Sequence, residues 1–460
     1  MHKFNKYYFL GIGGIGMSAL ARYFNTKGFD VGGYDRTETK LTLDLVSEGI
    51  EISYGESLNF IPSKFMNPQN TLIVLTPAIP EDHPQLLYFR ELNFKILKRA
   101  ELLGEITLQS KSICIAGTHG KTTTSTITAH LLYQSHVSCS AFLGGISNNY
   151  NTNLLLSKDS NLVVIEADEY DRSFHQLSPF MAVITSVDAD HLDIYKTPEA
   201  FRESFEHFAS FILPGGVLIV RKGLDLNPVL QKGVKTYSYS MDEGGDFCAE
   251  NIRIANAEIL FDFVTPTEKI ADVRLGVPVR INVENSVAAM ALAWLNGATA
   301  DEIRVGISSF SGIYRRFNTV YKSDKIVFMD DYAHHPSELR ASIGSIRDLY
   351  PGRKITGIFQ PHLYTRTRDF ASDFSEALSM LDQLILLDIY PARELPIEGV
   401  SSELIFRDVK LENKIMCSTE NLLPLLENLD LDVLVTFGAG DIDKLVPLIK
   451  NQLKPQKKDS

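Results

Sequence analysis

Residues 112–123 read Ser-Ile-Cys-Ile-Ala-Gly-Thr-His-Gly-Lys-Thr-Thr, an apolar run that leads into a glycine loop and a lysine. The run predicts a buried strand over Ser112–Ala116, and the pattern from Lys121 onward predicts a helix. A glycine loop between a strand and a helix presents backbone N–H groups to phosphate oxygens. The lysine supplies a cation for the β- and γ-phosphates, and the threonine hydroxyl is a ligand for Mg²⁺. The stretch therefore predicts a nucleotide phosphate site made of Gly117, Thr118, His119, Gly120, Lys121, Thr122 and Thr123.

The first glycine loop in chain order, Gly11-Ile12-Gly13-Gly14-Ile15-Gly16, follows a predicted strand over Tyr7–Leu10 and precedes a predicted helix from about Gly16 to Lys27. It fits GxGxxG, in which glycines let the backbone approach a pyrophosphate at a helix N-terminus. Asp35 follows the next predicted strand, Val31–Tyr34, at the place where an acid meets ribose hydroxyls. The residues predicted to bind a pyrophosphate-bearing ligand are Gly11, Gly13, Gly14, Gly16 and Asp35.

The first glycine loop taken alone, at residues 11–16, indicates an NAD-dependent dehydrogenase. A dehydrogenase does not explain two such loops in one chain, because Lys121 would have no role in it. The sequence also lacks a set of residues suited to hydride transfer. We therefore expect one loop to bind ATP and the other a different pyrophosphate-bearing molecule. A non-enzymatic nucleotide-binding regulator is a further alternative.

The order of strands and helices indicates α/β domains with parallel sheets, because strand-like and helical patterns alternate along the chain. New runs of this alternation begin near Tyr7, Ser112 and Lys325. At about 100–200 residues per domain, 460 residues give two to four domains. We predict three, over residues 1–105, 106–312 and 313–460, each on a largely parallel sheet. The first and third are Rossmann-like, the second is a P-loop ATPase domain, and residues 242–280 form an antiparallel flap within it.

Composition excludes several classes of protein. The net charge is −12, from 45 basic and 57 acidic residues, which argues against a nucleic-acid partner. The four cysteines have no paired spacing, so we expect a reducing compartment, the cytoplasm. No stretch reaches about 18 unbroken apolar residues, so we expect no membrane insertion. The apolar N-terminal run resembles a secretory signal, but four glycines interrupt it.

Acidic residues follow two predicted strands of the middle domain. Glu166-Ala167-Asp168-Glu169-Tyr170-Asp171 comes after Leu162–Ile165, and a carboxylate there would lie beside the phosphate loop as a Mg²⁺ ligand. The alternative is a solvated acidic loop. Asp188–Asp193 follows the next strand, Ala182–Thr185, and contains His191. His191 is either a second metal ligand or a structural histidine.

The third domain gathers charged and aromatic residues at two strand ends, where ligands bind in open α/β sheets. Residues 330–336 (Asp-Asp-Tyr-Ala-His-His-Pro) follow one predicted strand, and residues 360–368 (Gln-Pro-His-Leu-Tyr-Thr-Arg-Thr-Arg) follow the next. We therefore predict a small-substrate site there. Arg315-Arg316-Phe317 lies at the domain junction, where an arginine could clamp a transferring phosphate or remain on a solvated face.

The motifs in combination resemble those of the Mur ligases, the amino-acid-adding enzymes of bacterial peptidoglycan synthesis. They are GIGGIGM, GTHGKTTT, EADE, DADHLD, RRF, DDYAHHP, QPHLYTRTRD, DIYPARE and GAGD, in this order over nearly the whole chain. The resemblance implies a first domain that holds the UDP of a sugar nucleotide and a second that is the ATPase core. It implies a third that closes over ATP and brings in the amino acid.

Within the family, the motifs are most similar to those of the members that join L-alanine to UDP-N-acetylmuramate. The reaction so implied has two steps: the lactyl carboxylate attacks the γ-phosphate to give an acyl phosphate, and the amine of L-alanine then displaces phosphate. ATP and Mg²⁺ are the implied cofactors. A recycling ligase that adds a whole tripeptide is the alternative, because EADEYD is similar in both.

The resemblance also implies roles for individual residues. It assigns Lys121 to the ATP phosphates, Thr122 and Glu166 to a first Mg²⁺, His191 to a second, Asn285 to the adenine, Arg316 to the γ-phosphate and Asp331 to the ribose. It assigns Tyr332, His334, His335 and Arg366 to the amino acid and acyl phosphate, and Phe174 and His175 to the vicinity of the muramoyl group.

Three positions depart from the family pattern. Leu363 stands where many members have an arginine, and Glu284 stands where a histidine commonly precedes the adenine-contacting asparagine. No lysine occurs between Lys196 and Lys222, the region in which sibling ligases carry a carbamylated lysine, and Glu206 lies at roughly that place. We therefore expect no carbamylation.

Overall fold

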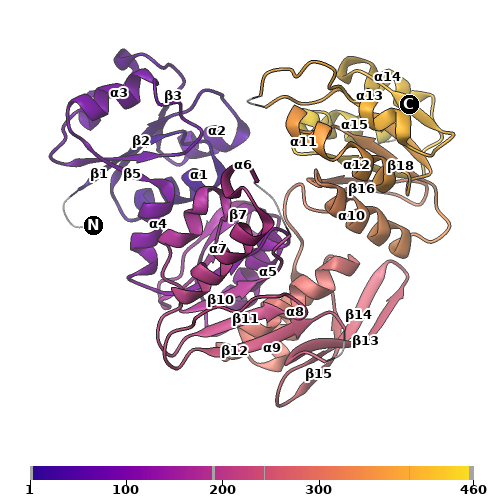
Figure 1. Ribbon diagram of the computed structural model, residues 1–460, viewed down its shortest axis with the longest axis horizontal. Helices are drawn as coiled ribbons and strands as arrows, with labels where there is room; N and C mark the ends of the chain where they lie inside the picture. Colours follow the sequence, from indigo (N-terminus) through magenta and orange to yellow (C-terminus); the bar gives the residue numbers. More distant parts are fainter. Residues whose placement is uncertain (1–3, 189–191, 243, 393, 455–460) are drawn as a thin grey trace, which may run out of the picture. The chain divides into compact units, whose positions relative to one another are not determined.

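The computed structural model describes residues 4–188, 192–242, 244–392 and 394–454 and contains three sheets (Figure 1). The chain divides into two compact units. The first ends at Phe310 and the second begins at Ser311, except that Asn251–Phe261 and Asp272–Val283 group with the second. None of the helices in the described ranges is long and apolar enough to cross a membrane.

The first sheet has five parallel strands. Their order is β3 (Glu51–Ser53), β2 (Asp30–Tyr34), β1 (Lys6–Leu10), β4 (Thr71–Leu75) and β5 (Lys95–Lys98). The helices around it are α1 (Ile15–Thr26), α2 (Lys40–Ser47), α3 (Pro84–Glu91) and α4 (Arg99–Thr107), with 3-10 turns at Leu58–Phe60 and Ser63–Phe65. Successive side chains of β1 enter different cores: Tyr7 and Phe9 pack with α1, and Tyr8 packs with α3. Helices therefore cover both faces, as in a doubly wound fold.

The second sheet has ten strands, with β6 between β10 and β9. The order is β15 (Lys269–Arg274), β14 (Glu258–Val264), β13 (Phe247–Ala255), β12 (Lys235–Ser240), β11 (Val217–Arg221), β10 (Met181–Ile184), β6 (Lys111–Ala116), β9 (Leu162–Glu166), β7 (Ser140–Ser147) and β8 (Thr152–Leu155). The helices are α5 (Lys121–Gln134), α6 (Leu192–Tyr195), α7 (Pro198–Ser210), α8 (Arg280–Leu295) and α9 (Ala300–Ser309), with a 3-10 segment, η3, at Tyr170–Gln176. β6 pairs in parallel with both β9 and β10.

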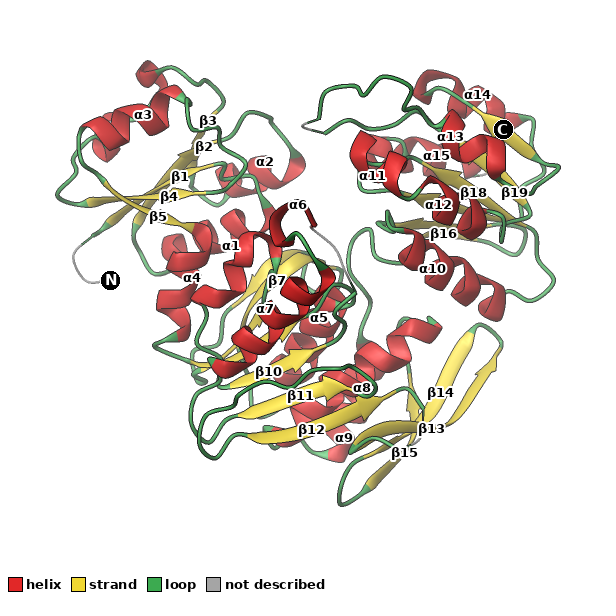
Figure 2. Cartoon of the chain, viewed as in Figure 1, coloured by secondary structure: helices red, strands yellow, loops and turns green. Residues whose placement is uncertain are grey.

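The third sheet has six strands, and only β16 is antiparallel to its neighbour. The order is β16 (Asn318–Lys322), β17 (Val327–Asp331), β21 (Val433–Phe437), β18 (Ile355–Phe359), β19 (Gln383–Leu386) and β20 (Lys414–Met416). Its helices are α10 (Pro336–Leu349), α11 (Tyr364–Asp369), α12 (Ala371–Leu378), α13 (Glu403–Asp408), α14 (Leu422–Glu427) and α15 (Val446–Leu453), with 3-10 turns at Thr419–Asn421 and Asp441–Lys444. Val327 and Met329 enter one core and Phe328 the other, so this sheet also lies between two layers of helices (Figure 2).

The predicted fold class, α/β with largely parallel sheets, is confirmed. The predicted flap is formed by β13, β14 and β15, which continue the second sheet beyond β12. β13 and β12 are parallel, however, with Tyr239 opposite Phe247. The predicted boundary after residue 105 falls inside α4.

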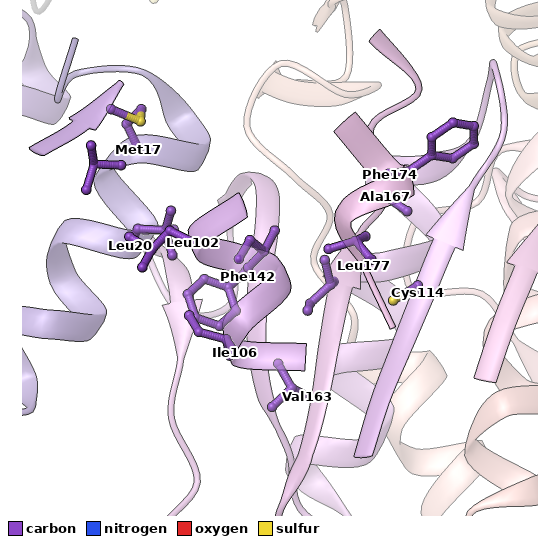
Figure 3. Packing of buried hydrophobic residues seen from close by; sticks show 14 of the residues in the cluster. Met17, Leu20, Leu102, Ile106, Cys114, Phe142, Val163, Ala167, Phe174 and Leu177 are labelled. Atoms are coloured by element: carbon purple, nitrogen blue, oxygen red, sulfur yellow. The ribbon is translucent and has the colours of Figure 1, made fainter. Parts of the chain in front are cut away.

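One hydrophobic core joins α1 and α4 to the second sheet. Leu20 of α1 and Ile106 of α4 belong to the same buried cluster as Phe142 of β7 and Cys114 of β6 (Figure 3). The contact holds the helix of the first glycine loop against the sheet that carries the second loop.

Buried hydrogen bonds of Asn153 also hold α1 against the second sheet. Asn153 of β8 is fully buried, and its amide nitrogen donates to the carbonyl of Ile15 at 2.6 Å and to the Ser18 hydroxyl at 2.9 Å. Its amide oxygen accepts from the Arg22 guanidinium at 2.5 Å, and Arg22 in turn pairs with Glu48 at 2.7 Å. Directional bonds of this kind set the orientation of α1, which apolar packing alone would leave less specific.

We expect Asn153→Ala to lower the free energy of unfolding by about 2–3 kcal/mol, because it removes a partner of a buried guanidinium and leaves the cavity of the amide. Urea-induced unfolding measures the difference. Asn161→Ala is the matched control, since Asn161 is exposed and its change should stay within about 0.5 kcal/mol. Equal stability of the two variants would contradict the assignment.

Candidate active site

The phosphate loop leaves the sheet at the C-terminal end of β6. Residues 117–120 connect β6 to α5, which begins at Lys121 as predicted. Gly117 has φ +137° and Gly120 has φ +81°, and Gly120 is the N-cap of α5. A Cβ at Gly117 would overlap the Thr185 hydroxyl, so the close approach of the two segments requires glycine at this position.

The segment that follows β10 braces the loop. The His119 N–H donates to the Ser186 hydroxyl at 2.8 Å, and the Thr185 hydroxyl donates to the His119 carbonyl at 2.5 Å. The Thr118 hydroxyl donates to the carbonyl of Asp188 at 2.8 Å. The loop is thus held in one conformation before any ligand binds, which lowers the entropy that binding would cost.

Lys121 and Glu169 form a buried ion pair at this loop. The Lys121 ammonium donates to the Gly117 carbonyl at 2.6 Å and lies 2.7 and 2.8 Å from the two Glu169 carboxylate oxygens. The two side chains are only 14% and 3% exposed. Glu169 was not singled out from the sequence, because it is one of four acidic residues within the six-residue segment 166–171.

The surroundings raise the pKa of both groups of the pair, for different reasons. Burial would lower the pKa of Lys121, but the carboxylates of Glu169, Glu166 and Asp168 outweigh it, and that pKa is raised. Burial raises the pKa of Glu169 to about 7, although the Lys121 charge opposes the shift. A protonated Lys121 is the state that the geometry supports, because carbonyl and carboxylate oxygens surround the ammonium.

Glu166 ends β9 directly beside the end of β6. A Cβ on Gly144 of β7 would overlap its carboxylate, so the glycine provides the space that this side chain occupies. The Thr122 hydroxyl and the Glu166 carboxylate are hard oxygen donors that fit Mg²⁺, which commonly takes one or two protein ligands together with phosphates and water. Within the described ranges no group of three His, Cys, Asp or Glu residues could hold a metal by itself. The predicted ligand His191 lies outside the described residues.

Asn285 of α8 lies against the phosphate loop. Its amide oxygen accepts from the Thr124 hydroxyl at 3.3 Å and would lie 2.7 Å from a Cβ at Gly120. Glu284, the departure from the family pattern, pairs with Arg221 at 3.1 Å. The structure thus brings together Lys121, Thr122, Glu166 and Asn285 around one strand end.

The first glycine loop connects β1 to α1. Gly11 has φ +85°, and Gly14 is the N-cap of α1. The Asp35 carboxylate accepts from the Gly13 N–H of this loop at 2.8 Å, and its contact to ribose hydroxyls stays a prediction. Arg99, at the start of α4, also lies against the loop, since a Cβ at Gly16 would overlap its guanidinium. No sequence motif singles out Arg99.

Phe174 and His175 lie in and beside the core, where they contact α7. Phe174 is fully buried and stacks on Phe208, with ring centroids 4.9 Å apart. His175 lies 3.0 Å from the carbonyl of Ser204 and stacks on Phe174. The expectation that Phe174 contacts a muramoyl group is not supported, because its ring is fully buried; His175 is partly exposed, and its proposed contact stays a prediction.

In the second unit, Tyr332 lies between two arginines. The guanidinium carbons of Arg315 and Arg316 lie 5.0 and 4.9 Å from the centre of its ring. Arg315 donates to the Gly438 carbonyl at 2.7 Å, so its role is to hold a loop. In the part of the chain that the structure describes, Arg316 forms no ion pair.

Asp331 is buried and bonded within the protein. Its carboxylate accepts from the Ser342 hydroxyl at 2.6 Å and from the Phe317 N–H at 3.3 Å. Burial raises its pKa, and burial raises the pKa of the neighbouring Asp330 to about 6. Asp331 therefore anchors the Arg315–Phe317 segment to β17, and a contact to an ATP ribose would have to compete with these bonds.

His334 and Arg366 lie near each other, whereas His335 is structural. His334 contacts the Tyr332 carbonyl at 2.9 Å through Nδ1, and burial lowers its pKa, with Glu338 opposing the shift and Arg366 adding to it. His335 caps α10 by accepting from the Ser337 N–H at 3.4 Å, its Nδ1 lies 2.8 Å from the Ser337 hydroxyl, and its ring faces Phe370. Leu363, at the start of α11, has φ +73°, a strained value for a leucine.

Comparisons with known proteins agree with this architecture. The family models described as "Mur ligase family, catalytic domain", "Mur ligase middle domain" and "Mur ligase, glutamate ligase domain" match residues 6–111, 115–293 and 315–440. A UDP-N-acetylmuramate--L-alanine ligase of Phocaeicola vulgatus is 59% identical over 443 residues, which is 96% of each chain. The chain belongs to the Mur ligase family, and the prediction of this family from the motifs is confirmed.

Two solved structures are also similar. A UDP-N-acetylmuramate-alanine ligase MurC from Thermotoga maritima matches with a TM-score of 0.82 and 26% identity, over 97% of this chain and 98% of that one. A murein peptide ligase from Psychrobacter arcticus matches with a TM-score of 0.69 and 20% identity, over 97% and 98% of the two chains. The second likeness shows a shared fold alone.

We expect Lys121→Ala to weaken ATP binding about 10- to 100-fold, because the ammonium would make charge-assisted bonds to the phosphates. It should also lower the melting temperature, since the buried Glu169 carboxylate loses the cation that it contacts. Calorimetric titration and thermal unfolding measure the two effects.

The double variant Lys121→Ala/Glu169→Gln separates the effect on ATP binding from the effect on stability. It removes the buried carboxylate charge, so it should recover stability without recovering ATP affinity. Recovery of ATP affinity in the double variant would mean that Lys121 does not contact the nucleotide.

Proposed function

We propose that this chain joins L-alanine to the lactyl carboxylate of UDP-N-acetylmuramate with consumption of ATP, giving UDP-N-acetylmuramoyl-L-alanine, ADP and phosphate. The observation that carries the proposal is the presence of two glycine loops in one compact unit, one of which carries Lys121 and the neighbouring carboxylate Glu166. A ligase that uses ATP and a sugar nucleotide needs two such sites. The name of the Phocaeicola vulgatus relative supports the same substrates.

The first step is activation of the carboxylate. Lys121 leaves Glu169 and contacts the β- and γ-phosphates, where it offsets the charge that accumulates as the γ-phosphoryl group moves. Thr122 and Glu166 are the residues that would hold Mg²⁺, which neutralises phosphate oxygens when bound. Asn285 lies where it can contact the nucleotide beside the loop. The product of this step is an acyl phosphate.

The second step is attack by the amine of L-alanine. Arg366 would bind the amino-acid carboxylate through its planar fork of donors. His334 has a lowered pKa and directs Nδ1 to the Tyr332 carbonyl, so a neutral ring would carry the Nδ1 proton and leave Nε2 as an acceptor for the amine proton. Arg316 would stabilise the leaving phosphate.

Other features agree with the proposal. All four cysteines are free thiols, as expected for a reducing compartment, and we place the enzyme in the cytoplasm. The acidic net charge of −12 supports small-molecule substrates over nucleic acid.

Phosphate release with purified protein, ATP, Mg²⁺ and UDP-N-acetylmuramate tests the proposal. We expect release that depends on L-alanine, and mass spectrometry should detect UDP-N-acetylmuramoyl-L-alanine. Parallel reactions with the tripeptide in place of L-alanine test the recycling activity. Release that is independent of L-alanine, or turnover with the tripeptide alone, would contradict the proposal.

We expect Arg366→Ala to raise the KM for L-alanine about 10- to 100-fold, because it removes a bidentate partner of the carboxylate. Arg366→Lys should recover only part of the loss, since a point charge does not reproduce the fork. Steady-state kinetics with L-alanine varied at saturating ATP and sugar nucleotide provide the measurement.

Arg368→Ala is the matched control for this helix. Arg368 is exposed and pairs with Asp369 at 2.8 Å, so its removal should leave the KM unchanged. If the two variants behave alike, Arg366 does not hold the carboxylate.

A further inference from the structure

A small cavity of the first unit lies between α1, which follows the glycine loop at residues 11–16, and the acidic segment at the end of β9. Its volume is about 90 Å³, and its polar lining comes from Gly16 of α1, Arg99 of α4, and Glu166 and Asp168 after β9. All four residues belong to the same compact unit. The cavity therefore has the first turn of the glycine-loop helix on one side and the carboxylates of the phosphate-loop side on the other.

Arg99 projects into this cavity and is held there by one carboxylate. Its Nη2 lies 2.9 Å from an Asp168 oxygen, and its Nη1 lies so close to Gly16 that a Cβ there would overlap it. The Arg99 side chain is 22% exposed. Over the described ranges no other hydrogen bond or ion pair involves this guanidinium, so most of its five N–H donors are available to a ligand.

A purely structural role does not account for the Arg99–Asp168 ion pair. Lys98, the preceding residue, pairs with Asp171 at 3.3 Å and already joins the start of α4 to the same acidic segment. That neighbouring pair is well exposed, at 60% and 45%, and does not line the cavity. Of the two cations, the one directed at the glycine-loop helix is the arginine, the side chain suited to bidentate binding of oxyanions.

The position of the guanidinium identifies the chemistry of its ligand. Gly16 lies in the first turn of α1, where backbone N–H groups favour an anion, and Glu166 marks the approach to the phosphate loop. A substrate that reaches from Gly16 toward Glu166 meets a cavity lined by two carboxylates, Glu166 and Asp168. Its own anionic groups need a cation at that point to offset the repulsion.

We propose that Arg99, positioned by Asp168, binds an oxyanion of the sugar nucleotide between the two glycine loops. This inference rests on the proposed function and adds a substrate-binding residue to it. The oxyanion is either a pyrophosphate oxygen or the lactyl carboxylate of the acceptor sugar. Both present the same chemistry, and a probe without the carboxylate distinguishes them.

Calorimetric titration of the full chain with UDP-N-acetylmuramate, UDP-N-acetylglucosamine and ATP tests the proposal. We expect Arg99→Gln to weaken binding of UDP-N-acetylmuramate about 10- to 100-fold and to leave ATP binding unchanged. Equal loss for UDP-N-acetylglucosamine, which has no lactyl group, assigns the contact to the pyrophosphate. Loss for UDP-N-acetylmuramate alone assigns it to the carboxylate.

Two further variants separate binding from folding. Arg99→Lys keeps the charge and the contact to Asp168 and should recover part of the affinity. Asp168→Asn should raise the KM for the sugar nucleotide several-fold with little change in kcat, because Asp168 acts by orienting Arg99. Lys98→Gln is the matched control and should retain wild-type binding and kinetics.

Wild-type affinity for UDP-N-acetylmuramate in both Arg99→Gln and Arg99→Lys would overturn the proposal, as would equal losses in Lys98→Gln. The wild-type protein distinguishes this failure from failure of the proposed function. If it binds and ligates UDP-N-acetylmuramate while the Arg99 variants are unaffected, only the role of Arg99 is wrong. If the wild-type protein neither binds nor ligates it, the proposed function falls and this inference falls with it.

Discussion

The parallel pairing of β6 with β9 on one side and β10 on the other is the constraint on which the candidate active site depends. Parallel strands place their C-terminal ends at the same edge, so Ala116, Glu166 and Ile184 end side by side. The phosphate loop must then leave the sheet between the acidic segment after β9 and the segment after β10. Lys121 reaches Glu169 on one side, and His119 is braced by Ser186 on the other.

Three buried or half-buried cations near this edge are paired within the protein. The Lys121 ammonium contacts Glu169, the Arg99 guanidinium contacts Asp168, and the Arg22 guanidinium contacts Asn153 and Glu48. A buried charge without a partner is strongly unfavourable, so these contacts keep the cations in place while no ligand is bound. For Lys121 and Arg99, anionic ligands would replace carboxylates that already hold the cation in position. Binding would then exchange one ion pair for another, which costs less desolvation than pairing a hydrated side chain.

The second unit applies the same principle at the ends of β17 and β18. Asp331 and His335 are engaged with the backbone or side chains around them and stabilise the segments that carry other residues. Tyr332 fixes the position of Arg316 by a cation–π contact. Among the described residues of this unit, Arg316 and Arg366 form no ion pair, and both have a proposed anionic ligand. Structural and ligand-binding roles are thus divided between adjacent residues of one motif.

The sequence by itself determined the fold class, the family and the positions of several elements. The predicted strands Tyr7–Leu10, Val31–Tyr34 and Ser112–Ala116 lie within β1, β2 and β6, and α5 begins at Lys121 as predicted. These elements follow from local apolar runs and glycine turns, which act over a few residues. Only the tertiary structure decided which polar residues meet. Nothing local distinguishes Phe174, which is core, from a ligand-contacting residue, and nothing local indicates that Arg99 lies against Gly16, 83 positions earlier in the chain. Burial and contact depend on how distant segments pack, and a motif specifies side chains near one strand end without specifying which other segment reaches it.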